Sequence, residues 1–168
     1  MPRVQERPPD RLSEEEVQRL ASISEPWGFV MRLGLGTGMR WGEMVRARAS
    51  DVSEGVLTVS QTKSGRVRRV PLPPELALEI RGRVGLLVPQ KNYWHSVLRI
   101  RRLSGVLRFH PHQLRHTFAC RWLERGGSLA SLQQMLGHVS IVTTQRYAKL
   151  TDEPVQSEAA RVMGNGAR

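Results

Sequence analysis

Cysteine is almost missing from this sequence of 168 residues, which contains only Cys120. A single thiol can form neither an internal disulfide nor a zinc cage built from cysteines, so we expect Cys120 to be a small buried apolar residue. The sequence also lacks a run of about 18 apolar residues, and its N-terminus lacks the apolar stretch that a secretory signal needs. We therefore expect one compact domain in the cytoplasm, with no membrane partner.

Lysine is scarce too, and the sequence contains only Lys63, Lys91 and Lys149. Lys and Arg together nevertheless outnumber Asp and Glu by 26 to 15. The net charge of +11 and the pI of about 11.4 attract polyanions, which makes nucleic acid the leading partner. Guanidinium groups carry most of this charge, and their planar fork suits bidentate contacts with phosphate. A GC-rich genome could equally explain the preference for Arg over Lys, but it does not explain the net charge.

Hydrophobic periodicity predicts a mainly helical chain. Ser13 and Glu16 form a capping box at the start of a first helix, and a second helix is expected from Pro26 to a glycine-rich break at 34–38, before a short helix over 40–46. Another helix is expected over 94–103. Three further helices are indicated by apolar stripes: Leu76, Ile80 and Val84 after Pro73 and Pro74; Leu114, Phe118 and Trp122 after Pro111; and Leu129, Leu132 and Leu136 after Ser128.

Two β-branched runs, Val56 to Val59 and Val67 to Val70, predict a β-hairpin with Lys63 near its tip. The expected fold class is therefore α+β, mainly α-helical with a small antiparallel β-sheet or hairpin. Residues 1–12 are rich in charge and proline and are expected to be a linker or arm, with the folded domain over 13–168.

A small set of polar residues interrupts the apolar framework. Its members are Arg40 with Glu43, Lys63 on the hairpin, His112 with Arg115, and His138 followed by Tyr147. Each one alone has an ordinary explanation: an Arg and a Glu three apart are usually a surface ion pair, a histidine after a helix usually caps carbonyls, and a lone tyrosine usually packs. Their function therefore depends on whether they act together.

His112 and His116 are four residues apart and could in principle share a metal, but the glutamate of a zincin-type site is missing and position 115 is an arginine. A cation there repels a metal and, with His112 three residues away on the same face, offers two donors to one anion. A phosphate fits that face. No carboxylate cluster could hold magnesium, so we expect no metal and no cofactor, and phosphoryl transfer would need a side-chain nucleophile such as Tyr147.

At these residues the chain resembles the tyrosine recombinase (phage integrase) family, from about Leu12 to its C-terminus. The most specific stretches are Pro-His-Gln-Leu-Arg-His-Thr-Phe-Ala over 111–119 and Leu-Gly-His over 136–138 with Tyr147 nine residues after the histidine. Thr-Gly-Met-Arg over 37–40 resembles the first arginine motif of the family, and Gln-Thr-Lys-Ser-Gly-Arg over 61–66 its hairpin lysine.

The resemblance implies the tyrosine recombinase catalytic-domain fold over 13–168, without the N-terminal core-binding domain, and a site-specific DNA recombinase acting on double-stranded DNA. Tyr147 would attack a phosphate and form a 3′-phosphotyrosyl link. The arginine and histidine donors that would stabilise the phosphate oxygens are Arg40, Arg115 and His138. Lys63 would protonate the leaving 5′-oxygen, His112 would assist proton transfer at Tyr147, and Glu43 would orient its neighbours.

The resemblance further implies self-association on DNA, since the family forms tetrameric synapses, in a DNA-associated protein of prokaryotic or phage origin. Two other functions stay open. A type IB topoisomerase uses the same tyrosine and arginine set but reseals the original strand, and a non-catalytic DNA-binding remnant or regulator would need only the charge and the helical body.

Overall fold

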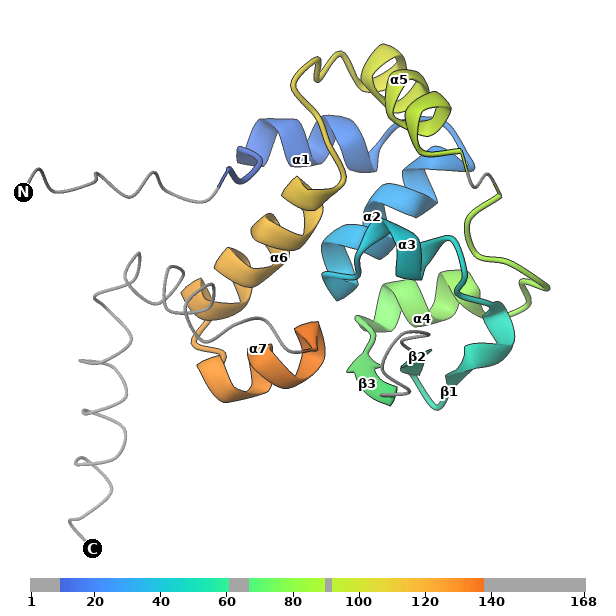
Figure 1. The fold of residues 1–168 in the computed structure, drawn as a ribbon, viewed down its shortest axis with the longest axis vertical. Coiled ribbons are helices and arrows are strands. Elements are labelled where there is room, and N and C mark those ends of the chain that lie inside the picture. The colour runs from blue at the N-terminus through green and yellow to red at the C-terminus, as the bar shows by residue number, and fades with distance from the viewer. Residues whose placement is uncertain (1–9, 61–66, 90–91, 138–168) are drawn as a thin grey trace, which may run out of the picture.

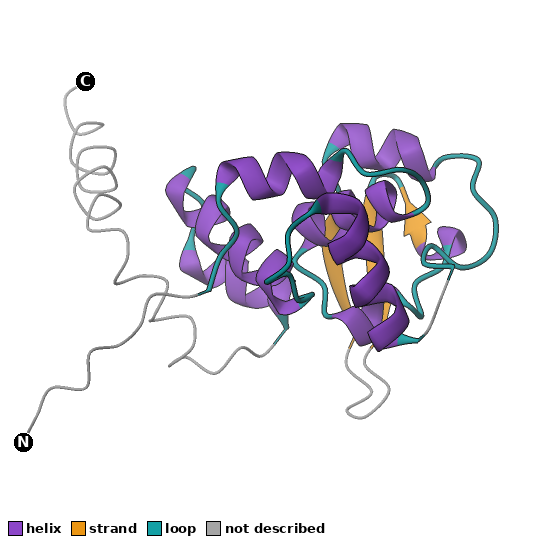
Figure 2. Ribbon diagram, turned by 90° about the horizontal axis from the view of Figure 1, so that it is seen from above, coloured by secondary structure: helices purple, strands orange, loops and turns teal. Residues whose placement is uncertain are grey.

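The computed structural model describes residues 10–60, 67–89 and 92–137. The predicted mixture of helices with a small sheet is confirmed (Figure 1, Figure 2). In chain order the elements are α1 (Glu14–Ala21), α2 (Trp27–Thr37), α3 (Trp41–Met44), the 3-10 helix η1 (Ala49–Asp51), β1 (Val52–Ser53), β2 (Val56–Ser60), β3 (Val67–Pro71), α4 (Pro74–Ile80), α5 (Tyr93–Ser104), α6 (His112–Glu124) and α7 (Leu129–Leu136). Within the described residues, no helix is both long and apolar enough to cross a bilayer.

Helix α2 lies at the centre of the main core, with α6 and α4 packed against it (Figure 1). Phe29, Val30, Met31 and Leu33 are fully buried on it, because α2 is apolar around most of its circumference. Gly34 lets α6 approach closely, since a Cβ there would lie 2.6 Å from Leu114 Cδ1. The end of α2, where the site residues begin, is therefore fixed to α6.

The glycine-rich stretch is not the break that was expected. Helix α2 runs through Gly34 and Gly36 and ends only at Thr37, with Gly38 in the left-handed conformation (φ +62°) as its C-cap. Tertiary packing explains this, because both internal glycines face close neighbours, Leu114 for Gly34 and Leu76 for Gly36. Of these three glycines, only Gly38 ends the helix, by adopting the left-handed conformation at the C-cap.

The predicted hairpin is confirmed by strands β2 and β3, which pair antiparallel with Leu57 opposite Val70 and Val59 opposite Arg68. A short strand that the sequence pattern did not indicate, β1, extends the sheet in the order β1-β2-β3. The hairpin tip over 61–66 lies outside the described residues. The sheet buries one face, on which Leu57 and Val70 are fully enclosed.

The predicted apolar stripe of the helix after Pro73 is wrong in its last member. Leu76 and Ile80 are buried on α4, but Val84 lies beyond the helix and is 94% exposed. Helix α4 ends at Ile80, and the chain then turns through Gly82, whose φ is +90°. A conformation that only glycine adopts readily ended the helix one turn earlier than periodicity suggested.

A second, smaller apolar cluster joins α6 to α7 and contains the stripe predicted for α7. Of the stripe predicted for α6, Leu114 packs in the main core, whereas Phe118 and Trp122 are only partly buried against the smaller cluster. Ala119, Cys120 and Leu123 of α6 pack with Leu132 and Leu136 of α7. Cys120 is buried, as expected of a small apolar residue. The cap predicted at Ser128 is present, because its side chain accepts a hydrogen bond from the Ser131 amide, and Gly137 ends α7.

The described part of the N-terminal segment lies against α6. Leu12 is buried, and its amide donates to Thr117 Oγ1 at 3.0 Å. Asp10 accepts hydrogen bonds from Gln113 Nε2 at 3.0 Å and pairs with His110 Nε2 at 2.9 Å. The chain before α1 is thus bound to the first two turns of α6, whereas the domain boundary at 12/13 stays a prediction.

Candidate active site

Arg115 joins two parts of the chain that contain predicted site residues. It is 5% exposed in the first turn of α6. Its Nη1 donates to the Gly38 carbonyl at 2.9 Å and its Nη2 to the Leu136 carbonyl at 2.8 Å. Gly38 precedes Arg40 by two residues, and Leu136 ends α7 just before His138. One guanidinium therefore sets the position of both segments.

Arg40 and Glu43 lie at the start of α3, and they are not the ordinary surface ion pair that their spacing suggests. Glu43 is 6% exposed, and its Oε2 caps the short helix by accepting from the Arg40 amide at 2.8 Å. The Arg40 guanidinium lies 3.4 Å from Glu43 Oε1 while its side chain remains 42% exposed. Arg40 is thus held by a buried carboxylate and still presents its charge to a ligand.

Arg68 on β3 is a third arginine of this region, which the sequence reasoning did not single out. Its Nη1 and Nη2 each donate to one oxygen of Glu43 at 2.8 Å, and its Nε donates to the Met135 carbonyl at 2.6 Å. Its side chain is only 9% exposed. One signal could have found it: Arg68 lies two residues before buried Val70, so strand alternation places a cation on the core face, where it needs an anionic partner.

These contacts set the charge of Glu43. Burial alone would raise its pKa, but the hydrogen bonds from Arg68 and from the Arg40 amide, together with the charges of both arginines, hold the pKa of this carboxyl below its ordinary value. Glu43 is therefore ionised at neutral pH and serves as a fixed acceptor rather than as a proton donor.

His112 and His116 lie on the first turns of α6, with ring centroids 4.8 Å apart in an edge-to-face contact. Burial and the charges of Arg115, His110 and Arg40 lower the pKa of His112. Burial, with the neighbouring imidazoles, lowers the pKa of His116 to about 4. Both rings are therefore largely neutral near pH 7, and His112 lies within the field of the two site arginines. Across the described ranges, no group of three or more His, Cys, Asp or Glu residues could hold a metal ion.

The structure thus brings together four of the seven predicted site residues: Arg40, Glu43, His112 and Arg115. Arg40 comes from the α2–α3 connection, Glu43 from α3, and His112 and Arg115 from α6, and the end of α7 is bound to Arg115. The other three, Lys63, His138 and Tyr147, lie outside the described residues.

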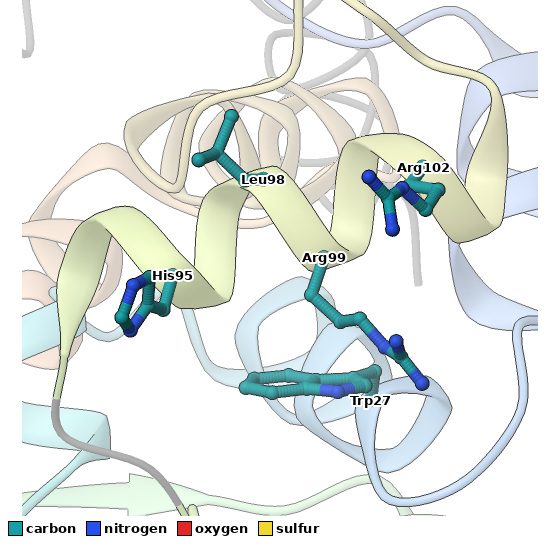
Figure 3. A pocket seen from close by; sticks show the side chains of 5 residues that line it. All are labelled: Trp27, His95, Leu98, Arg99 and Arg102. Carbon is teal, nitrogen blue, oxygen red and sulfur yellow. The ribbon is translucent and has the colours of Figure 1, made fainter.

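A separate basic pocket of about 390 Å³ lies between α5 and the N-terminal end of α2. His95, Leu98, Arg99 and Arg102 line it from α5, and Arg99 extends toward the indole of Trp27 (Figure 3). All five lining residues are basic, aromatic or apolar. This composition suits an anionic ligand with a flat or apolar part.

Known proteins similar to this chain include a tyrosine recombinase and a phage integrase. The model of the phage integrase family matches residues 87–153. The tyrosine recombinase XerA of Pyrococcus furiosus is 30% identical over 184 residues, covering 95% of this chain and 64% of XerA. The integrase of Escherichia phage P2 is 32% identical over 160 residues, covering 92% of this chain and 48% of that integrase.

The solved catalytic domain of bacteriophage HP1 integrase superposes with a TM-score of 0.75 at 29% identity, covering 94% of this chain and 98% of that domain. The chain spans about half to two thirds of the length of the curated relatives that it matches.

Proposed function

Since this chain belongs to the phage integrase family of tyrosine recombinases, we propose that it performs the chemical step of site-specific DNA recombination, in which DNA strands are cut and rejoined through Tyr147 without a metal. The fold is that of the tyrosine recombinase catalytic domain. The single observation that carries the proposal is the convergence of Arg40, which precedes α3, with His112 and Arg115 of α6, where Arg115 also binds the end of α7.

In the proposed reaction the Tyr147 hydroxyl oxygen attacks a phosphodiester phosphorus, and the bond from phosphorus to the 5′-oxygen breaks. The tyrosine proton passes to His112, whose lowered pKa leaves a neutral ring able to accept it. Lys63 gives a proton to the departing 5′-oxygen. The phosphotyrosyl product is itself a phosphodiester, so a 5′-hydroxyl of a partner duplex can reverse the step without ATP.

Charge on the phosphate oxygens would be balanced by Arg40, Arg115 and His138. The exposed guanidinium of Arg40 supports this role, since a preorganised donor stabilises a transition state without reorganising during the reaction. Glu43 would orient Arg40. Its ionised carboxylate already accepts hydrogen bonds from Arg68 and from the Arg40 amide, so it is a fixed acceptor and does not take part in proton transfer. Its role is that of a positioning residue.

Double-stranded DNA is the proposed partner, and self-association on DNA is proposed with it. The net charge of +11 supports the first proposal. The basic pocket on α5 offers a further place for a phosphate outside the catalytic arginines, with Arg99 and Arg102 one helical turn apart on the same helix (Figure 3).

The test is covalent trapping on a nicked duplex that carries a candidate site and loses the released strand. Wild-type protein should form a protein–DNA adduct, and Tyr147→Phe should bind the same DNA without forming it. The matched control is Tyr93→Phe, which changes the other tyrosine of the chain and should still be trapped.

Trapping by Tyr147→Phe would refute the nucleophile, and failure of the wild type on substrates that it binds would favour a non-catalytic DNA-binding protein. Joining of strands from two duplexes distinguishes recombination from the supercoil relaxation of a type IB topoisomerase.

A further inference from the structure

Two arginines with little exposed side chain bind neighbouring carbonyls at the end of α7. Arg68 donates to Met135 O at 2.6 Å and Arg115 donates to Leu136 O at 2.8 Å. The last carbonyls of a helix have no partner within the helix, and cations are favourable there because of the helix dipole. The α7 terminus is therefore bound from two sides, by strand β3 and by helix α6.

The same two arginines also hold the segment around Arg40. Arg115 binds the Gly38 carbonyl, and Arg68 binds both oxygens of Glu43, which in turn contacts the Arg40 amide and guanidinium. Arg68 thus stands between two features of the site, the Glu43 carboxylate and the α7 terminus, and it contacts each through a different part of one rigid guanidinium.

We propose that Arg68 is a positioning residue for DNA cleavage. It orients Arg40 through Glu43 and fixes the position of the end of α7 relative to Arg40. This inference rests on the proposed function of the chain. A planar guanidinium with three donors in one plane suits the task, because its contacts with Glu43 and Met135 fix their relative position. A lysine at this position could neutralise Glu43 but could not make all three contacts.

Removing the charge of Arg68 should raise the pKa of Glu43. The charged groups that face Glu43 are Arg68 and Arg40, and Arg40 is the more exposed and more distant guanidinium. Without Arg68, burial dominates and Glu43 takes up a proton more readily, so it loses its hold on the Arg40 side chain as the pH falls. Loss of Arg68 should therefore make cleavage depend on the protonation of Glu43.

The experiment compares Arg68→Met with Arg69→Met, because both variants lose one positive charge from the same strand. Arg69 is exposed, whereas Arg68 is not. Affinity for DNA should fall equally in the two variants. The rate of adduct formation on saturating nicked DNA should fall about 10- to 100-fold in Arg68→Met, as for other residues that orient a reacting group, and by less than about 2-fold in Arg69→Met.

A pH profile separates positioning from loss of structure. The rate of Arg68→Met relative to wild type should rise with pH over about pH 5 to 8.5, as Glu43 ionises again. In the double variant Arg68→Met/Glu43→Gln this ratio should not vary with pH. Thermal unfolding of each variant establishes that the protein is folded, and Arg68→Gln, which also removes the charge and should show the same pH trend, carries the test if Arg68→Met does not fold.

Two results would overturn the inference: adduct formation by Arg68→Met at the rate of Arg69→Met, or a deficit in Arg68→Met that does not vary with pH. If the wild type itself forms no adduct, the proposed function fails instead, so the two failures are distinguishable.

Discussion

Replacing Arg115 with methionine should destabilise the protein even in the absence of DNA. The variant loses two hydrogen bonds from a charged donor, at 2.9 and 2.8 Å, in a residue that is 5% exposed. A hydrogen bond to a charged group contributes about 1.5–3 kcal/mol, and methionine, of similar length, recovers part of the packing but leaves both carbonyls without this donor. We expect a loss of about 3–5 kcal/mol in the free energy of unfolding.

Urea unfolding followed by tryptophan fluorescence measures this loss, since the chain contains four tryptophans. The matched control is Arg121→Met on the same helix, whose partner Glu14 is exposed, so its removal should cost no more than about 1 kcal/mol. A loss below about 1 kcal/mol for Arg115→Met would refute the structural role of this guanidinium. Cleavage by the variant should then be compared at equal folded fraction, because an inactive Arg115 variant reports on stability as well as on chemistry.

The remaining predictions concern stability as well. Gly38→Ala should lower the free energy of unfolding by about 2–4 kcal/mol, because the φ of Gly38 is +62° and a Cβ there would lie 2.5 Å from Phe118 Cδ1. The control Gly36→Ala, inside α2 with the nearest neighbour of its Cβ at 3.1 Å, should stay within about 1 kcal/mol of wild type. Equal losses of the two variants in urea unfolding would contradict this. His116 has a pKa of about 4 when folded and 6.5 when unfolded, so only the unfolded chain takes up its proton between these values, and stability should fall by up to about 3 kcal/mol as the pH drops from 6.5 to 4. His116→Gln should flatten this part of the curve of unfolding free energy against pH, and a curve parallel to that of wild type would count against the assignment.

Local features of the sequence were enough to predict most of the elements. The capping box at Ser13 and Glu16, the cap at Ser128 and the glycine that ends α7 act within one turn of their own residue, so they can be recognised without tertiary information. The stripes of α6 and α7 and the two strands of the hairpin have the period of the element that they form. The arginine and histidine motifs are likewise short stretches of sequence. They identified the family, and similarity to its members confirmed it.

Contacts between segments that are distant in the chain decided the rest. Gly34 is helical because Leu114, eighty residues later, packs on it, and β1 forms only because β2 offers it an edge. Periodicity extended the α4 stripe to Val84, but the backbone turns at Gly82 before that residue.

The site shows the same division between sequence and structure. Residue types and spacing indicated Arg40, Glu43, His112 and Arg115, but they suggested a surface ion pair for Glu43 and no role for Arg68. Only the folded chain buries Glu43 and brings Arg68 to it from a strand 25 residues away. The sequence by itself determined which groups could bind a phosphate, whereas the tertiary structure decided that Arg40 is exposed and that Arg68 and Arg115 are largely enclosed and bound to other segments of the chain. Burial and pairing depend on distances between separate elements, which no local pattern encodes.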